Sequence, residues 1–341
     1  MTDTSGYAEI DLPNGWAPRP YQRALWKYLE RGGKRADVVA HRRWGKDDVS
    51  LHWTAIASTQ KVGTYWHLLP EASQARKAIW DAINPHTGKR RIDEAFPKEM
   101  RASTRDNEMM IRFKNGSTWQ VVGSDNFNSL VGSPPVGVVF SEWSLAKPDA
   151  WTYIRPILAE NGGWAVFIWT TRGRNHATQA FEARSRDPTW FTLKSSAQET
   201  GVFTPEQLAK ERQELIDEAG SAEEGEAKFA QEYLCDFDAS VPGSYYGTLM
   251  SAALTEKRIT RVPYDPGLKV DTAWDLGIDD YTAIWYFQQI GREVRVIDYY
   301  ETSGEGLQSI VRAAIDGRRQ GGLSQPYSYG RHHLPHDVMV R

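Results

Sequence analysis

The fold of this chain is decided by the stretch Asp37-Val38-Val39-Ala40-His41-Arg42-Arg43-Trp44-Gly45-Lys46-Asp47-Asp48. An apolar, strand-like run leads into a glycine-lysine turn, and a helical pattern then continues to about residue 59. A strand, loop and helix in this order can bind phosphate groups. Backbone N–H groups at the helix N-terminus surround the phosphates, and the lysine reaches the outer ones. We therefore expect Gly45 and Lys46 to bind the phosphates of a nucleotide.

The loop departs from the usual pattern at two positions. Measured against G-x-x-x-x-G-K-[ST], the first glycine is Ala40 and the hydroxyl residue after the lysine is Asp47. The hydroxyl at this position normally lies beside the Mg²⁺ ion that accompanies ATP. We therefore expect Asp47 to lie beside the metal as a carboxylate in place of a hydroxyl.

A second motif complements this departure. The apolar run that begins at Val138 ends in Ser141-Glu142, where a parallel α/β sheet delivers its functional groups. Such a strand usually ends in Asp-Glu, the aspartate acting near Mg²⁺ and the glutamate polarising the attacking water. Here Ser141 replaces the aspartate and Glu142 remains as the base. Asp47 and Ser141 are thus either exchanged ligands of one working metal site or signs of a degenerate site without hydrolysis.

Two weaker signals lie around these motifs. Thr170 and Thr171 follow an apolar run, and polar residues at a sheet edge can sense the γ-phosphate and pass its loss to a moving segment. Upstream, Tyr21 and Gln22 precede a helical stretch, so Gln22 could contact an adenine edge while Tyr21 stacks on the base.

Strand-like and helical patterns alternate along the chain, which predicts an α/β fold with a mainly parallel sheet. Further strands are expected at residues 64–69, 109–113, 118–122, 136–140 and 164–169, with a helix at 71–83. Residues 204–233 are helical and charged and should form a lid that closes a first domain of residues 1–238. A linker at 239–247 then precedes a second α/β domain, residues 248–341, with strands at 270–274, 282–288 and 294–300 and a helix at 306–318.

Composition limits the class of protein. A chain of 341 residues is long enough for two domains, and no apolar run approaches the ~20 residues that cross a bilayer. The N-terminal residues have no secretory signal, and the single cysteine, Cys235, suits a reducing cytosol. We expect a cytoplasmic protein that is neither secreted nor bound to a membrane. The formal net charge of −3 means that any contact with nucleic acid must use local basic clusters.

Taken together, the motifs resemble the large terminase subunits of tailed phages. The resemblance covers nearly the whole chain and rests on Pro20-Tyr21-Gln22, Arg42-Arg43-Trp44-Gly45-Lys46, Leu130-Val131-Gly132, Val138 to Glu142, Thr170-Thr171-Arg172-Gly173 and Glu232-Tyr233-Leu234-Cys235-Asp236-Phe237. It implies an ATPase in which Gln22 binds adenine, Lys46 binds phosphate and Glu142 is catalytic. It further implies that Thr170 and Thr171 couple hydrolysis to motion and that Arg42 or Arg43 stabilises charge on the phosphate.

The resemblance also implies that the second domain is an RNase H-like nuclease that uses two Mg²⁺ or Mn²⁺ ions. Two-metal sites need several carboxylates from different strands. Asp275 resembles the first acid and Asp337 the second, both as metal ligands. The family's third acid lies further downstream, whereas this chain ends at Arg341, so we expect a C-terminally incomplete domain with impaired nuclease activity.

The implied function is ATP-driven translocation of double-stranded phage DNA into a procapsid. The implied partners are DNA, the small terminase subunit and the portal, on which the chain would form a homo-oligomeric ring in the cytoplasm of the infected bacterium. Two alternatives stay open. One is a helicase-like DNA-translocating ATPase outside packaging, which would not need Asp275 and Asp337. The other is a non-catalytic assembly subunit with a decayed ATP site.

Overall fold

The computed structural model describes Leu12 and residues 15–124, 134–239, 246–277, 281–318 and 326–335. The chain folds as two compact units, Met1–Ser251 and Ala252–Arg341. Residues 240–245 of the expected linker lie outside the described residues, and the division between the units falls inside helix α10 (Gly247–Thr255). Within the described part of the chain, no helix is long and apolar enough to span a membrane.

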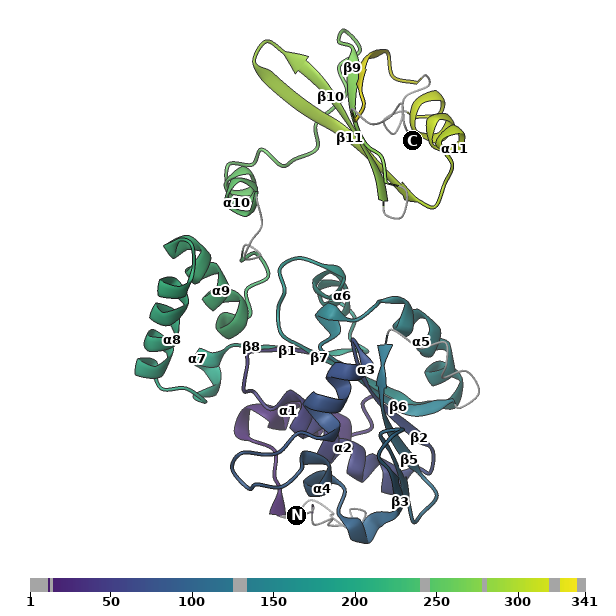
Figure 1. Ribbon diagram of the computed structural model, residues 1–341, viewed down its shortest axis with the longest axis vertical. Coiled ribbons are helices and arrows are strands. Elements are labelled where there is room, and N and C mark those ends of the chain that lie inside the picture. The colour runs from purple at the N-terminus through teal and green to yellow at the C-terminus, as the bar shows by residue number, and fades with distance from the viewer. Residues whose placement is uncertain are drawn as a thin grey trace. The chain divides into compact units, whose positions relative to one another are not determined.

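The first unit is built on an eight-stranded sheet with the order β3-β4-β5-β2-β6-β7-β1-β8 (Figure 1). Six neighbouring strands are parallel, and β3 and β4 extend the sheet antiparallel at one edge. The mainly parallel sheet confirms the α/β fold expected from the sequence. The strands are β1 (Arg35–Ala40), β2 (Thr64–Leu69), β3 (Arg101–Arg105), β4 (Met110–Phe113), β5 (Thr118–Gly123), β6 (Pro135–Ser141), β7 (Trp164–Trp169) and β8 (Phe191–Ser195).

Helices cover both faces of this sheet, which explains why its central strands are apolar without alternation. All residues of β7 are buried, and so are all but the first of β1. The helices of this unit outside the lid are η2 (Pro20–Gln22), α1 (Arg23–Glu30), α2 (Lys46–Gln60), α3 (Ala72–Ala75), η3 (Arg76–Trp80), α4 (Arg91–Ala95), η4 (Lys98–Met100), η6 (Trp143–Leu145), α5 (Asp149–Asn161) and α6 (His176–Arg184).

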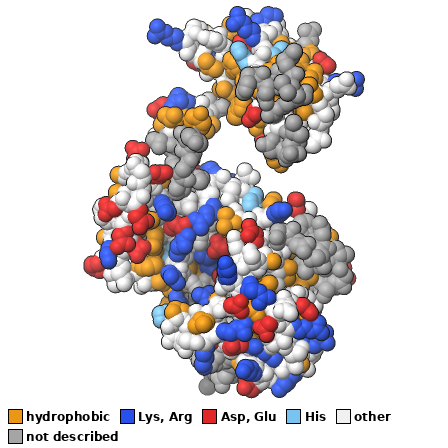
Figure 2. Space-filling view, viewed as in Figure 1, with side chains coloured by type: hydrophobic (Ala, Val, Ile, Leu, Met, Phe, Trp, Pro, Cys, Tyr) orange, Lys and Arg blue, Asp and Glu red, His pale blue; other side chains and the backbone are white. Residues whose placement is uncertain are grey.

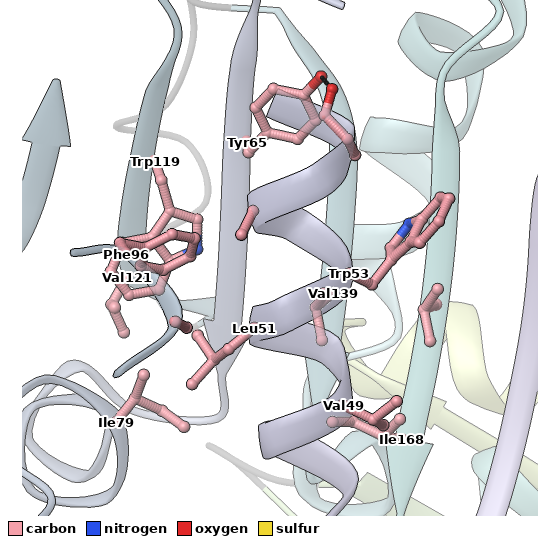
Figure 3. Packing of buried hydrophobic residues seen from close by; sticks show 14 of the residues in the cluster. Val49, Leu51, Trp53, Tyr65, Ile79, Phe96, Trp119, Val121, Val139 and Ile168 are labelled. Atoms are coloured by element: carbon pink, nitrogen blue, oxygen red, sulfur yellow. Dashed lines mark hydrogen bonds between the residues drawn. The ribbon is translucent and has the colours of Figure 1, made fainter. Parts of the chain in front are cut away.

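Helix α2 lies at the centre of the larger hydrophobic core. Its Val49, Leu51 and Trp53 are buried in one cluster with Val139 of β6 and Ile168 of β7 (Figure 3). Burial extends around most of the helix, as expected for a helix packed both on a sheet and under other helices. This packing fixes the N-terminal end of α2, and therefore the loop before it, against the ends of β6 and β7.

The lid predicted at residues 204–233 is a helical hairpin of α8 (Pro205–Glu218) and α9 (Ala222–Leu234), preceded by the short α7 (Ala197–Thr200). Thr204 caps α8: its hydroxyl accepts from the Gln207 N–H, while the Gln207 side chain accepts from the Thr204 N–H. A Cβ on Gly225 would approach the Cα of Ile216 to 2.4 Å. Glycine at this position is what lets the two lid helices pack so closely.

The second unit contains a four-stranded sheet of order β11-β10-β9-β12. The strands β9 (Val270–Asp275), β10 (Tyr281–Ile290) and β11 (Glu293–Ser303) are antiparallel neighbours, and β12 (Tyr329–His333) runs parallel to β9. Helix α11 (Leu307–Val311) continues as the π-helical turn η7 (Arg312–Asp316) and packs on one face of this sheet through Ile310 and Ala314.

Candidate active site

The loop between β1 and α2 has the geometry of a phosphate-binding loop. Gly45 occupies the position before the first residue of α2 with φ +85°, a left-handed conformation that favours glycine. A Cβ there would also lie 2.9 Å from Nε2 of Gln22, so a side chain at this position would have to displace the Gln22 amide. The first N–H groups of α2 have no carbonyl one turn earlier to bond, and they point into this loop. The arrangement is suited to an anion.

Lys46 is buried at the start of α2 and its ammonium group has three protein acceptors. Nζ donates to the Ala40 carbonyl at 3.0 Å, the His41 carbonyl at 3.3 Å and Oγ1 of Thr170 at 2.9 Å. Burial lowers the pKa of Lys46, and the nearby carboxylates of Glu142 and Asp47 oppose that shift. A phosphate oxygen in the loop could replace these neutral acceptors with a charged one.

The two unusual positions of the motifs meet in the structure. Oγ of Ser141, at the end of β6, donates to Oδ1 of Asp47 at 2.7 Å. The same Oδ1 lies 3.1 Å from Nε2 of His67, a fully buried residue of β2. Burial by itself would raise the pKa of Asp47. The bonds from His67 and Ser141 and the charge of Lys46 outweigh burial and lower this pKa to about 2. Asp47 is therefore a carboxylate at neutral pH.

Glu142 follows β6 directly and has an unusual backbone, with φ 51° and ψ 45°. Left-handed conformations of residues other than glycine are strained and concentrate at functional sites. Burial raises the Glu142 pKa, as does the charge of Asp47, while Lys46 and two arginines act in the opposite direction. A carboxylate with a raised pKa beside a phosphate-binding loop is a suitable proton acceptor.

Glu232 of the lid helix α9 links the loop to the segment after β7. Nε and Nη2 of Arg42 donate to its two carboxylate oxygens, and Nη1 of Arg172 donates to Oε1. Thr171 adds a bond from its hydroxyl to the carbonyl of Gln231. Burial would raise the Glu232 pKa, but the two arginines hold it below its ordinary value. The lid is thus attached to two of the predicted motifs.

The other expected residues have simpler environments. The Arg43 side chain is exposed to solvent. Gln22 is buried, and its Nε2 donates to the Trp44 carbonyl at 2.8 Å while its Oε1 accepts from the Arg19 N–H. The Tyr21 ring lies 5.4 Å from the ring of Trp44. The Gln22 side chain is therefore hydrogen-bonded to the backbone of the phosphate-binding loop. Its contact with adenine stays a prediction.

The expected acids of the second unit are only partly described. Asp275 is the exposed last residue of β9, whereas Asp337 and residues 130–132 of the first unit lie outside the described residues. Asp298, another acid of this sheet, accepts from Arg318 and from the Tyr327 hydroxyl. Within the described ranges, no group of three or more His, Cys, Asp or Glu side chains could hold a metal ion.

Comparison with known proteins gives similarity in structure and none in sequence. No protein-family model matches the chain, and no curated protein matches it. Among solved structures, the Thermus phage P74-26 large terminase ATPase domain matches with a TM-score of 0.52 and 19% identity, over 65% of this chain and 95% of that one. The chain has the large-terminase ATPase fold.

A second large terminase, from another thermophilic bacteriophage, matches over 95% of this chain and 79% of its own, with a TM-score of 0.52 and 10% identity. The same protein in complex with ATP-gamma-S matches with a TM-score of 0.51 and 13% identity, over 84% of this chain and 68% of that one. At identities this low, the structural similarity establishes a shared terminase fold and nothing about the reaction. The chemistry must therefore be argued from the site.

In this terminase fold, the segments that follow β1, β6 and β7 bring Lys46, Ser141, Glu142 and Thr170 together, while their roles stay predictions. Three contributors were not assigned a role from the sequence: His67, Arg172 and Glu232. A histidine inside the otherwise apolar run Tyr65-Trp66-His67-Leu68-Leu69 is the one signal that could have drawn attention to β2.

Proposed function

We propose that the chain is the ATP-hydrolysing motor of a phage DNA-packaging machine, a large terminase subunit that moves double-stranded DNA into a procapsid. The observation that carries this proposal is the convergence of Lys46, the Asp47–Ser141 pair and Glu142 at one end of a terminase-type sheet. The second large terminase was solved in complex with ATP-gamma-S, which supports a nucleotide as the ligand of this fold.

Each residue has a distinct role in the proposed reaction. Lys46 neutralises the outer phosphates, and the N–H groups of the loop bind their oxygens. Glu142 accepts the proton of the attacking water, because it is the carboxylate beside the loop whose pKa is raised. Arg42 and Arg172 supply positive charge near the γ-phosphate, and the solvent-exposed Arg43 is available to the same phosphate.

The Asp47–Ser141 pair fits Mg²⁺, because both groups offer the hard oxygen atoms that this ion prefers. Ser141 donates its proton to Asp47, and within the described residues its oxygen accepts no hydrogen bond, so its lone pairs can face a cation. In the usual arrangement the hydroxyl belongs to the loop and the carboxylate to the strand. Here the two elements exchange these groups and keep one of each. Bound Mg²⁺ would neutralise charge on the phosphates. The exchange favours a working site over a decayed one.

Thr170 and Thr171 are proposed to couple hydrolysis to motion. Thr170 contacts the phosphate-binding lysine, and the next residue bonds α9 of the lid. Loss of the γ-phosphate would change the environment of Lys46 and, through these two adjacent threonines, the position of the lid. Tyr21 and Gln22 complete the proposed nucleotide site on the adenine side.

Contact with DNA should be made mostly to phosphates, because a motor must move along any sequence. Figure 2 shows acidic side chains gathered over the lid helices and basic side chains gathered beside them. The acidic surface of α8 and α9 would repel DNA, so the basic surface is the better candidate for DNA contact. The exposed lid acids are Glu206, Glu214, Asp217, Glu218 and Glu223.

We propose the small terminase subunit and the portal as partners, a homo-oligomeric ring on the portal, and the host cytoplasm as the location.

The second unit supports a second proposed activity, a metal-dependent nuclease of RNase H-like type. The supporting observation is its sheet, in which Asp275 ends the strand β9 that pairs antiparallel with β10 and parallel with β12. Asp337, the proposed second acid, lies outside the described residues. Asp298 does not add a third ligand, since Arg318 and Tyr327 occupy its carboxylate. We expect weak or no cleavage of duplex DNA with Mg²⁺ or Mn²⁺. Robust cutting that Asp275→Ala removes would contradict this.

The decisive experiment for the motor is a magnesium-dependent ATPase assay on the full chain with Lys46→Ala. Turnover should be abolished while the circular dichroism spectrum is unchanged. Lys27→Ala is the matched control, because Lys27 is an exposed lysine of α1 in the same unit. Unchanged turnover in Lys46→Ala would remove the assignment of the phosphate-binding loop. A helicase-like motor outside packaging would show DNA unwinding, which we do not expect.

A further inference from the structure

His67 is the least expected member of the site. It lies inside β2 with its side chain completely buried. Nε2 is 3.1 Å from Oδ1 of Asp47, while Nδ1 is buried and has no hydrogen-bond partner within the described residues. The neighbouring ring is that of Trp119, 6.4 Å away between centroids. Within the described residues the buried imidazole therefore makes one hydrogen bond, and that bond is to Asp47 at the start of α2.

Packing alone does not account for this histidine. A buried nitrogen without a partner is unfavourable, and an apolar side chain of similar size would avoid that cost. The bond from His67 to Asp47 requires a proton on Nε2, because the carboxylate of Asp47 can only accept. The hydrogen bond from Nε2 to the Asp47 carboxylate therefore offsets the cost of burying Nδ1 without a partner.

The two donors to Asp47 act on the same oxygen. Ser141 and His67 both bond Oδ1, and within the described residues no hydrogen bond reaches Oδ2. A carboxylate held by two donors at one oxygen cannot rotate freely about its Cβ–Cγ bond. Its other oxygen is then kept in one direction and is available to a cation. A hydroxyl in this position would need no such restraint, since it has only one oxygen.

We propose that His67 is a positioning residue that fixes the carboxylate of Asp47 for Mg²⁺ bound with the nucleotide. This inference rests on the proposed ATPase function and adds a residue to it. His67 acts through Asp47 and touches neither nucleotide nor metal. Partners of this kind, one bond removed from a metal, commonly change metal affinity by roughly 10–100-fold when they are removed.

The test compares His67→Met with His67→Gln in the full chain. The two replacements have similar length, but only glutamine carries an N–H that can reach Asp47. We measure ATP turnover against Mg²⁺ concentration, and ADP affinity with and without Mg²⁺. His67→Met should raise the half-maximal Mg²⁺ concentration about tenfold or more and leave Mg²⁺-free ADP binding unchanged. His67→Gln should restore most of the wild-type Mg²⁺ dependence.

The control is His52→Met. His52 is also a buried histidine whose Nε2 has no partner within the described residues, but it bonds the Asp48 carbonyl and not Asp47. This variant should respond to Mg²⁺ as the wild type does. Should His67→Met not fold, His67→Phe serves the same test, because phenylalanine also lacks the donor.

The outcomes separate the two proposals. If His67→Met responds to Mg²⁺ as the wild type does, or if His67→Gln is as impaired as His67→Met, the inference about His67 is wrong and the ATPase function stands. If the wild-type chain neither binds ADP nor hydrolyses ATP at any Mg²⁺ concentration, the proposed function is wrong and this inference falls with it.

Discussion

Exchanging the side chains of Asp47 and Ser141 gives the sharpest test of the site. Asp47→Ser leaves two hydroxyls and removes the negative charge that accepts from Ser141 at 2.7 Å. A hydrogen bond to a charged group contributes about 1.5–3 kcal/mol. Ser141→Asp instead puts two carboxylates in that space, where they repel each other and the phosphates. Each single change should therefore lower kcat/KM for MgATP.

The double change should recover much of the loss, because it restores one hydroxyl and one carboxylate in the usual places. Residues in direct contact couple by roughly 0.5–3 kcal/mol, and a bond to a charged group belongs in the upper part of that range. We therefore expect a coupling energy of about 1–3 kcal/mol, or about 5- to 150-fold in kcat/KM.

The assay is steady-state ATP hydrolysis by all four proteins of the cycle, with circular dichroism to establish that each is folded. The control cycle pairs Asp48→Ser with Ser141→Asp, because Asp48 bonds Trp16 and not Ser141. That cycle should be additive. Additive losses in the Asp47 cycle as well would mean that the two side chains do not share a metal ion. The non-catalytic alternative would then be the better interpretation.

Three further predictions follow from the same contacts. Glu142→Gln should bind ATP normally and lose turnover, because an amide cannot accept the proton of water; normal turnover would require another base. Glu232→Gln should weaken the attachment of α9, seen as faster amide hydrogen exchange in that helix. In the wild type the pKa of Glu232 is depressed, so the stabilisation from this attachment is fully present above pH 4.5, the ordinary pKa of the group. It is lost as the pH falls through the lower pKa of Glu232 in the folded protein. Arg184→Met should cost about 3–5 kcal/mol in urea unfolding, because it leaves the fully buried Asp37 carboxylate without its cation; a loss below about 1 kcal/mol would show that Asp37 becomes neutral instead.

Much of the first unit could be predicted because its signals are local. The central strands β2, β6 and β7 are buried on both faces, so each appears in the sequence as an apolar run of the right length. Two strands were missed. In β8 only Ser195 is buried, and β3 is almost entirely exposed, so neither has the pattern of a buried strand. Their membership of the sheet depends on backbone pairing with a neighbour, which composition does not encode.

The sequence by itself determined the parts of the site that follow a strand. Gly45, Lys46 and Asp47 lie in the loop and helix start that follow β1, Ser141 ends β6 and Glu142 comes directly after it. Their place at the carboxyl edge of a parallel sheet therefore follows from chain order alone. That edge gathers residues that are far apart in the chain without any need for matching sequence between them.

Only the tertiary structure decided which side chains touch. His67 reaches Asp47 because β2 lies beside β6 in the sheet order. The sequence around residue 67 does not indicate which strand lies next to β2. Glu232 forms an ion pair with Arg42, 190 residues earlier in the chain, because lid helix α9 packs against the loop between β1 and α2. Hydrogen bonds and ion pairs depend on distances of about 3 Å. Such distances are set by the packing of whole helices and strands, and local sequence carries no record of them.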